Sequence, residues 1–271
     1  MSIGLSRRDA LILFAAAPVA LAQDSQLPLN TSGVEHVGFS VPDPQKSAAF
    51  YGRIFDPQIF QEMSPPLRYY CRLGISYVAF GPGNADVPGR MDHFCATVED
   101  YRLGDLQAEL RPSNINLFGS DGFNAIEDPD GIRIQFMATP GGLLPTIIAS
   151  TRVTQEDAIC EAVGLDHVML RVPDPEKSAD FYRRFFGRET SRERDHDRIW
   201  FTLARTRVGL EPTQNGEEPH IHHFGIRVAG FDRDVVARKL EAIGVTVLPS
   251  SDENLLRFED HDGFPVELRG V

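Results

Sequence analysis

The chain has 271 residues, 42 % of them hydrophobic, and a formal net charge of −12 at pH 7. This length and apolar content suffice for one or two domains with buried cores. The acidic balance argues against nucleic acid as a partner, because nucleic-acid binding requires a clustered positive surface.

The first predicted element is an export signal at residues 1–22. The pair Arg7 and Arg8 precedes the apolar stretch Leu11–Leu21, and small residues follow as a cleavage site. A membrane anchor is disfavoured, because a span needs about 20 unbroken apolar residues and this shorter stretch contains Pro18. We therefore expect twin-arginine export, a periplasmic or secreted mature chain, and no membrane contact after cleavage of the signal.

Two later stretches are nearly the same sequence. Val34–Phe55 reads VEHVGFSVPDPQKSAAFYGRIF, and Leu165–Phe186 reads LDHVMLRVPDPEKSADFYRRFF. Self-similarity at this spacing indicates an internal duplication. Each copy predicts a strand, 34–41 and 165–172, which ends at proline because proline cannot donate to a ladder. An amphipathic helix follows each strand.

Each half contains a second strand that starts at a histidine. These strands are HFCATV from His93 and HFGIRV from His223, and each leads into a helix. Each half then ends in two strands around an Asp-Gly turn, EDPDGIRIQF and EDHDGFPVEL. We predict an α+β fold of four βαβββ modules, two per half. The predicted segments are a first domain over 31–138, a linker over 139–163 and a second domain over 164–271.

This pattern resembles the vicinal oxygen chelate superfamily, which includes glyoxalase I, bleomycin-resistance proteins and extradiol ring-cleavage dioxygenases. The strand-starting histidines, the VPDPxKSAxFY run and the two Asp-x-Asp-Gly endings carry the resemblance. It covers essentially the whole mature chain. Four modules in one chain are most like the extradiol dioxygenases. The resemblance implies that paired modules curve into a cup, with metal ligands pointing inward from the first and last strands.

In the second half, the resemblance implies a metal site formed by His167, His223 and Glu267. Two imidazoles and one carboxylate make a facial triad that suits Fe(II) or Mn(II) and leaves positions for a substrate and dioxygen. Zn(II) stays open. An inward-facing carboxylate at Glu267 would be costly without such a partner.

The first half repeats these positions as His36, His93 and Gln135, a second and weaker candidate metal site. It is weaker because an amide oxygen brings no charge, and the first half of the extradiol relatives carries no metal. A single strand histidine is usually an ordinary core or surface residue, but four at matching positions favour metal binding. Cys95 shares a strand face with His93, where a buried cysteine commonly serves as a small apolar residue.

Other residues expected of these enzymes are absent. The fourth ligand of glyoxalase I falls at an alanine in the first half and a glycine in the second. The acid–base His and Tyr of the extradiol enzymes fall at arginine or aspartate, although such groups typically contribute about 10²–10⁴ in rate. Four other histidines are left as substitutes, and their spacing favours none of them. They are His196, His220, His222 and His261.

Arginines occupy several of these positions. Arg205, Arg207 and Arg257 can clamp a carboxylate, because guanidinium presents a planar fork to such groups. We take Arg257 and Arg205 as candidate catalytic, substrate-anchoring residues, and Trp200 as a candidate pocket residue. A solvated arginine that points away from the site is the alternative in each case.

The first hypothesis is an exported metal enzyme, most like a dioxygenase, that acts on a small substrate chelating the metal through two neighbouring oxygens. The first alternative is a metal-dependent lyase or isomerase acting on a small hydroxy- or oxo-acid. The second is a non-catalytic, resistance-type protein that binds a small molecule, and the last is a structural module. A homo-oligomer stays open, because this fold often buries strand edges between subunits.

Overall fold

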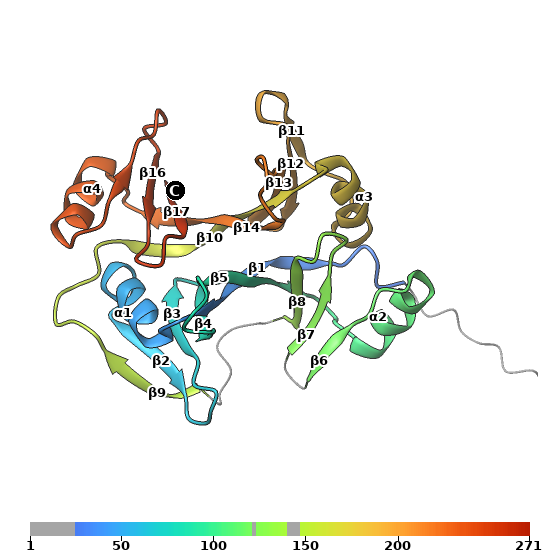
Figure 1. The fold of residues 1–271 in the computed structure, drawn as a ribbon, viewed down its shortest axis with the longest axis horizontal. Helices are drawn as coiled ribbons and strands as arrows, with labels where there is room; N and C mark the ends of the chain where they lie inside the picture. Colours follow the sequence, from blue (N-terminus) through green and yellow to red (C-terminus); the bar gives the residue numbers. More distant parts are fainter. Residues whose placement is uncertain (1–24, 121–122, 140–146) are drawn as a thin grey trace, which may run out of the picture.

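The computed structural model describes residues 25–120, 123–139 and 147–271. The predicted export signal lies outside these residues. The described part of the chain forms two β-sheets, one per half, stacked face to face (Figure 1). None of its helices combines the length and apolar character needed to cross a bilayer.

The predicted module of one strand, one helix and three strands occurs four times, so the fold prediction is confirmed. The first half consists of β1 (Thr31–Val41), α1 (Pro44–Ile54), β2 (Gln58–Glu62), β3 (Tyr69–Leu73), β4 (Ser76–Pro82), β5 (Arg90–Val98), α2 (Leu103–Leu110), β6 (Phe118–Ser120), β7 (Phe123–Glu127) and β8 (Arg133–Ala138). The second half consists of β10 (Glu161–Val172), α3 (Pro175–Phe186), β11 (Ser191–Glu193), β12 (Arg198–Leu203), β13 (Thr206–Pro212), β14 (His220–Ala229), α4 (Arg233–Ala242), β15 (Val247–Leu248), β16 (Leu255–Glu259) and β17 (Pro265–Gly270).

The two modules of each half meet at their first strands. The first sheet has the order β6-β7-β8-β5-β1-β4-β3-β2-β9, and β1 pairs with β5 antiparallel. The second sheet has the order β11-β12-β13-β10-β14-β17-β16-β15, with β10 and β14 at the equivalent junction. Strand β9 (Ile147–Arg152) extends the first sheet beyond β2, and it lies within the segment that we predicted as a linker.

Helix α1 begins where the sequence predicts. The Asp43 carboxylate accepts a hydrogen bond from the backbone N–H of Lys46 at 3.0 Å, and Pro44 occupies the first turn. Helix α3 repeats the arrangement, with Asp174 accepting from the N–H of Lys177 at 3.1 Å. The repeated Pro-Asp-Pro thus ends a strand and caps the next helix.

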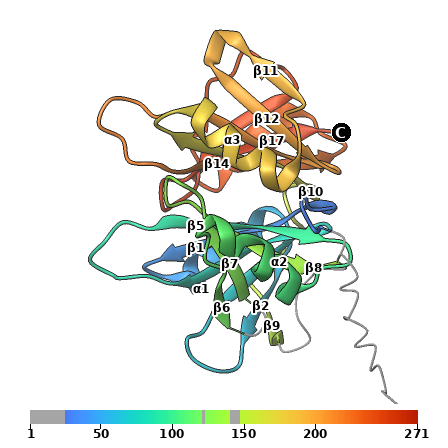
Figure 2. The same cartoon turned by 90° about the vertical axis from the view of Figure 1, so that its right-hand side faces the viewer.

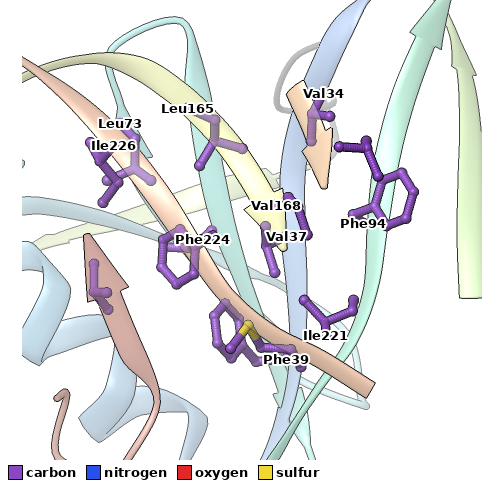
Figure 3. Packing of buried hydrophobic residues seen from close by; sticks show 14 of the residues in the cluster. Val34, Val37, Phe39, Leu73, Phe94, Leu165, Val168, Ile221, Phe224 and Ile226 are labelled. Atoms are coloured by element: carbon purple, nitrogen blue, oxygen red, sulfur yellow. The ribbon is translucent and has the colours of Figure 1, made fainter. Parts of the chain in front are cut away.

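Apolar side chains of the two sheets pack against one another in a single core (Figure 3). Val37 and Phe39 of β1 and Val168 of β10 are buried there, and the rings of Phe39 and Phe224 lie 5.8 Å apart. Because side chains alternate along a strand, the histidines beside these residues point to the opposite face. Each half therefore presents its two candidate ligand histidines, which are His36 and His93 or His167 and His223, on the sheet face that looks away from the other half.

The helix motif of each half contacts the Asp-x-Asp-Gly turn of the other half. The Tyr51 hydroxyl of α1 donates to Asp260 at 2.8 Å, and the Ser47 hydroxyl donates to Asp262 at 2.7 Å. We call these four residues the first interhalf cluster. The second interhalf cluster consists of Tyr182 donating to Asp128 at 2.8 Å and Ser178 donating to Asp130 at 2.6 Å. Each VPDPxKSAxFY helix is thus bound to the Asp-x-Asp-Gly turn of the other half (Figure 2 shows α3 facing the first half).

Candidate metal centre

Three neighbouring strands of the second sheet bring the predicted triad together. In the β10-β14-β17 order, His167 pairs with Gly225, and Gly225 pairs with Glu267. The Nε2 atom of His167 lies 3.5 Å from one Glu267 oxygen, and the Nε2 atom of His223 lies 3.6 Å from the other. The two imidazole rings stand edge to face, with centroids 5.2 Å apart. All three side chains are buried.

A glycine makes room for the first ligand. A Cβ atom at Gly225 would lie 2.4 Å from Cε1 of His167, so any side chain there would displace the imidazole. The first half has the same device at a different position, because a Cβ atom at Gly38 would lie 2.1 Å from Cε1 of His93. The position of each glycine therefore decides which ring lies flat on the sheet.

A β-bulge places an acid beside His167. The pairing of β10 with β14 skips Asp166, so the aspartate and the histidine project to the same side of the sheet. The Asp166 carboxylate lies 2.7 Å from Nδ1 of His167 and accepts from Arg207 at 2.6 Å. Burial by itself would raise the pKa of Asp166, but the hydrogen bonds from His167 and Arg207 hold it well below its usual range. The ionised aspartate fixes the proton of His167 on Nδ1 and turns Nε2 toward Glu267.

The second ligand histidine has a different neighbour. A bulge of β14 places His222 beside His223, with their Nδ1 atoms 2.8 Å apart. His222 also lies 3.4 Å from the carboxylate of Glu211. Burial, followed by the neighbouring His167 and His222, lowers the pKa of His223 well below its usual value. The neutral imidazole is the form that binds a metal ion.

The donor set fits a divalent cation. Nε2 of His167 is buried and has no hydrogen-bond partner, although it lies 3.5 Å from the Glu267 carboxylate. The ligand atoms of His167, His223 and Glu267 all lie within 4.8 Å of one another. Two neutral nitrogens and one carboxylate are the facial triad of non-haem iron sites, and manganese is held by similar ligands. These residues are therefore suited to hold Fe(II) or Mn(II).

A cavity of about 480 Å³ opens above the triad. Four arginines line it, and each has a carboxylate partner that uses part of its hydrogen-bonding capacity. Since a guanidinium carries five N–H donors, the remaining donors can bind an anionic ligand. The arginines are Arg198, Arg207, Arg257 and Arg269.

Of the two arginines predicted to anchor a substrate, Arg257 lines the cavity and Arg205 does not. Arg257 lines the cavity and donates from Nε to Glu267 at 2.7 Å, so it contacts a predicted metal ligand directly. Arg205 is exposed in the turn between β12 and β13, outside the cavity lining, because its strand register ends before it. Arg207 faces the cavity instead, with its guanidinium carbon 4.6 Å from the ring centroid of Trp200. Trp200 also lines the cavity, as the sequence suggested.

The four histidines considered as replacements for the missing acid–base residues lie in different parts of the structure. His196, at the end of a short 3-10 helix (Arg194–His196), lines the cavity above the triad. His220 and His222 line a different groove between the halves. His261 lies beside Phe50, with ring centroids 5.3 Å apart. His196 is therefore the one of these four that can reach a ligand in the triad's cavity.

The predicted site of the first half is also assembled. Nε2 of His36 lies 3.3 Å from Nε2 of His93 and 3.0 Å from Oε1 of Gln135. Glu35 and Asp92 contact the Nδ1 atoms of the two histidines, as Asp166 does in the second half. Burial lowers the pKa of His93, which favours its neutral form.

Comparison with known proteins agrees with this architecture. Residues 164–268 match the family model described as the Glyoxalase/Bleomycin resistance protein/Dioxygenase superfamily. The second half of the chain belongs to this superfamily. The first half repeats the same order of strands and helices. The chain is also 23 % identical over 197 residues to a probable chloroplastic lactoylglutathione lyase of Arabidopsis thaliana, covering 65 % of this chain. It spans about half the length of that relative.

Solved structures share the fold at low sequence identity. The Mn(II)-bound glyoxalase from Novosphingobium aromaticivorans has a TM-score of 0.65 at 14 % identity, covering 89 % of this chain and 83 % of that one. The 2,3-dioxygenase LapB from Pseudomonas sp. KL28 has a TM-score of 0.66 at 15 % identity, covering 90 % and 93 %. Homoprotocatechuate 2,3-dioxygenase from Arthrobacter globiformis has a TM-score of 0.65 at 16 % identity, covering 92 % and 82 %.

The sequence analysis missed the residues that orient the ligands. An acid directly precedes three of the four strand-starting histidines, as Glu35, Asp92 and Asp166. This regularity was visible, but in an ideal strand adjacent residues point to opposite faces. Only the bulges bring acid and histidine to the same side.

Proposed function

We propose that the protein is a metal-dependent, dioxygenase-like enzyme whose active site is the cavity above His167, His223 and Glu267. The observation that best supports this proposal is that three buried potential ligands meet at Nε2 of His167, which has no hydrogen-bond partner. When bound there, Fe(II) or Mn(II) would supply open coordination positions and polarise a small substrate with two neighbouring oxygens. Zn(II) remains open, and so does a homo-oligomer.

The arginines favour a substrate with an anionic group. Arg207 is held between Asp166 and the face of Trp200, which fixes its planar fork. Arg257 is bound to Glu267 and remains partly exposed at the cavity wall. A carboxylate on the substrate would accept the remaining N–H donors and orient the reacting end toward the triad.

We propose His196 as the proton-transfer residue. It lines the cavity and is exposed, so its imidazole can contact a hydroxyl group of a bound substrate. A positioned acid or base typically contributes about 10²–10⁴ in rate. His196→Gln should therefore lower kcat by roughly this factor while leaving metal content unchanged.

A lyase or isomerase acting on a small hydroxy- or oxo-acid is the second candidate. The observation that favours it is the set of four arginines around a single cavity. The two candidates differ in one measurable property, because only the dioxygenase consumes oxygen. A non-catalytic binding protein would bind its ligand equally well with and without metal.

Export by the twin-arginine route, to the periplasm or the exterior, stays a prediction from residues 1–22. A cofactor loaded before export would accord with a metalloenzyme. Fractionation of cells that express the full chain, with Arg7 and Arg8 both changed to lysine as the control, tests it.

The deciding experiment uses the chain from Gln23, loaded anaerobically with Fe(II) or Mn(II). Oxygen uptake is measured with catechols that carry or lack a carboxylate, and hydroxy-acid conversion is measured without oxygen. We expect oxygen uptake that is faster with the carboxylate-bearing catechol and absent in Glu267→Ala. Glu241→Ala, which removes an exposed carboxylate on α4, is the matched control.

Acid conversion without oxygen uptake would replace the dioxygenase with the lyase or isomerase. Retention of full metal content and turnover in Glu267→Ala would refute the site itself.

A further inference from the structure

The guanidinium of Arg257 binds one side of the Glu267 carboxylate. The two residues lie directly opposite each other on the antiparallel strands β16 and β17. Nε and one terminal nitrogen of Arg257 each lie 2.7 Å from the same carboxylate oxygen, Oε1. The other oxygen, Oε2, lies 3.5 Å from Nε2 of His167. A cation held by the triad would therefore share this carboxylate with Arg257.

The burial of Glu267 explains why it needs such a partner. Its side chain is 8 % exposed, whereas that of Arg257 is 41 % exposed. Taking an ionised carboxylate out of water is costly unless an opposite charge and hydrogen bonds compensate it. The two histidines of the triad lie 3.5 and 3.6 Å from the carboxylate, farther than the guanidinium. Arg257, which stays partly hydrated, is thus the group that compensates the buried charge.

The first half provides an internal comparison. The position equivalent to Glu267 is Gln135, which pairs with Ala125 across β7 and β8. Ala125 therefore takes the position of Arg257, and it is fully buried. A cation lies opposite the charged third position, and a methyl group lies opposite the neutral one. The arginine thus accompanies the charge of the carboxylate and is not a requirement of the strand arrangement that both halves share.

We propose that Arg257 is a positioning residue that acts as the counter-ion of Glu267 when the triad holds no metal, and that a metal ion competes with it for the carboxylate. The proposal rests on the triad being the metal site of the proposed function. Arg257 lowers the affinity for a divalent cation, because its charge repels the ion and its hydrogen bonds engage the ligand. In return, the buried carboxylate stays compensated without metal. The N–H donors that do not reach Glu267 stay available to an anionic substrate.

This role predicts an effect opposite in sign to that of a residue that only orients a ligand. Loss of an orienting residue lowers metal affinity by about 10–100-fold. Loss of a counter-ion leaves a buried, unpaired carboxylate, which destabilises the metal-free protein until a metal binds. Arg257→Met removes the charge and keeps an unbranched side chain. It should therefore bind Mn(II) about 10-fold more tightly than the wild type.

The test uses the chain from Gln23 and combines isothermal titration with Mn(II) and the Tm, measured with a chelator and at saturating Mn(II). Arg257→Met should have a lower metal-free Tm than the wild type and should gain more from Mn(II). Arg257→Lys, which keeps the charge, should restore both properties toward the wild type. Arg269→Met is the matched control, because Arg269 lines the same cavity and pairs with Asp252 at 3.4 Å. It should leave the Mn(II) affinity near the wild-type value.

A double variant separates charge from packing, even if Arg257→Met alone does not fold. In the Glu267→Gln background no carboxylate needs a counter-ion, so Arg257→Met should no longer lower the metal-free Tm. An equal loss in both backgrounds would overturn the proposal, and so would weaker Mn(II) binding by Arg257→Met. Absence of Mn(II) binding by the wild type would refute the metal site and the competition. The metal-free comparison tests the counter-ion role by itself, so the two failures can be told apart.

Discussion

The candidate metal sites of the two halves are built from equivalent strands and differ in the residues that these strands carry. Each has two histidines from the first strands of its modules and a third ligand position on the last strand. The third position is Gln135 in one half and Glu267 in the other, and the floor between ligands is Cys95 or Gly225. One scaffold therefore offers a neutral set with a sulfur atom and a charged set without one.

The interhalf clusters changed less than the floors. Ser47 and Tyr51 of the first copy have the same kind of aspartate partners as Ser178 and Tyr182 of the second. Each motif contacts the other half, so a change in one copy would leave a buried carboxylate in the other without its partner. The most recognisable sequence motifs of this chain therefore maintain packing, while the candidate metal ligands lie elsewhere.

Exchanging the third ligands tests the difference between the cups most strongly. Glu267→Gln gives the second half a neutral third ligand and should weaken its Fe(II) or Mn(II) binding by more than about 100-fold. Loss of a residue that only orients a ligand already costs roughly 10–100-fold. Gln135→Glu should have the opposite effect in the first half. Isothermal titration with Mn(II) measures both.

Equal Mn(II) affinity before and after the exchange would show that the carboxylate does not distinguish the cups. Glu259→Gln, on strand β16, controls for the loss of one negative charge.

The interhalf clusters should give the chain a pH dependence that is alike in both copies. Burial raises the pKa of Asp128 and of Asp260 to about 6, against hydrogen bonds that lower it. The native state therefore holds these protons between about pH 4 and 6, where the unfolded state has released them. The protons bound to these two aspartates therefore add to the free energy of unfolding. The added stability is complete below about pH 4 and is lost as the pH rises through 6.

Asp128→Asn removes this dependence, since the amide stays neutral. Relative to the wild type, its free energy of unfolding should rise by up to about 3 kcal/mol between pH 4 and 7, from about two pKa units at 1.36 kcal/mol each. Asp260→Asn should behave alike. Urea unfolding at several pH values measures both, and a difference that does not vary with pH would contradict the assignment.

The sequence predicted the fold well because its signals are local. The Pro-Asp-Pro caps, the alternating strands and the Asp-Gly turns each act within a few residues, and the duplication showed each of them twice. The ligand triad was reached through family resemblance, because its members come from strands distant in sequence. Arg205 shows the limit of counting along the chain, since the turn before β13 leaves it exposed and places Arg207 at the cavity.

The carboxylate behind the ligand histidine gives a smaller, symmetric test. Asp166→Asn should reduce metal affinity of the second half by about 10–100-fold, because the amide no longer fixes the His167 tautomer. Asp92→Asn should do the same to the first half only. Isothermal titration of each variant with Mn(II) measures the loss.

Each of these two variants also removes a carboxylate partner of an arginine, Arg207 or Arg133, although Arg133 keeps Glu127 at 3.4 Å. Arg207→Gln, which keeps Asp166, therefore shows how much of the effect arises from the ion pair. An effect of Asp166→Asn no larger than that of Arg207→Gln would mean that the aspartate does not orient His167.

The smallest effects should come from the serines of the interhalf clusters. Ser47→Ala and Ser178→Ala each remove one hydrogen bond to a partly buried aspartate, and each should lower the free energy of unfolding by about 1–2 kcal/mol. If the halves are held by equivalent contacts, the two losses should agree within about 0.5 kcal/mol and should add in the double variant, because the sites share no partner. A loss at one serine only would mean that a single cluster holds the halves together.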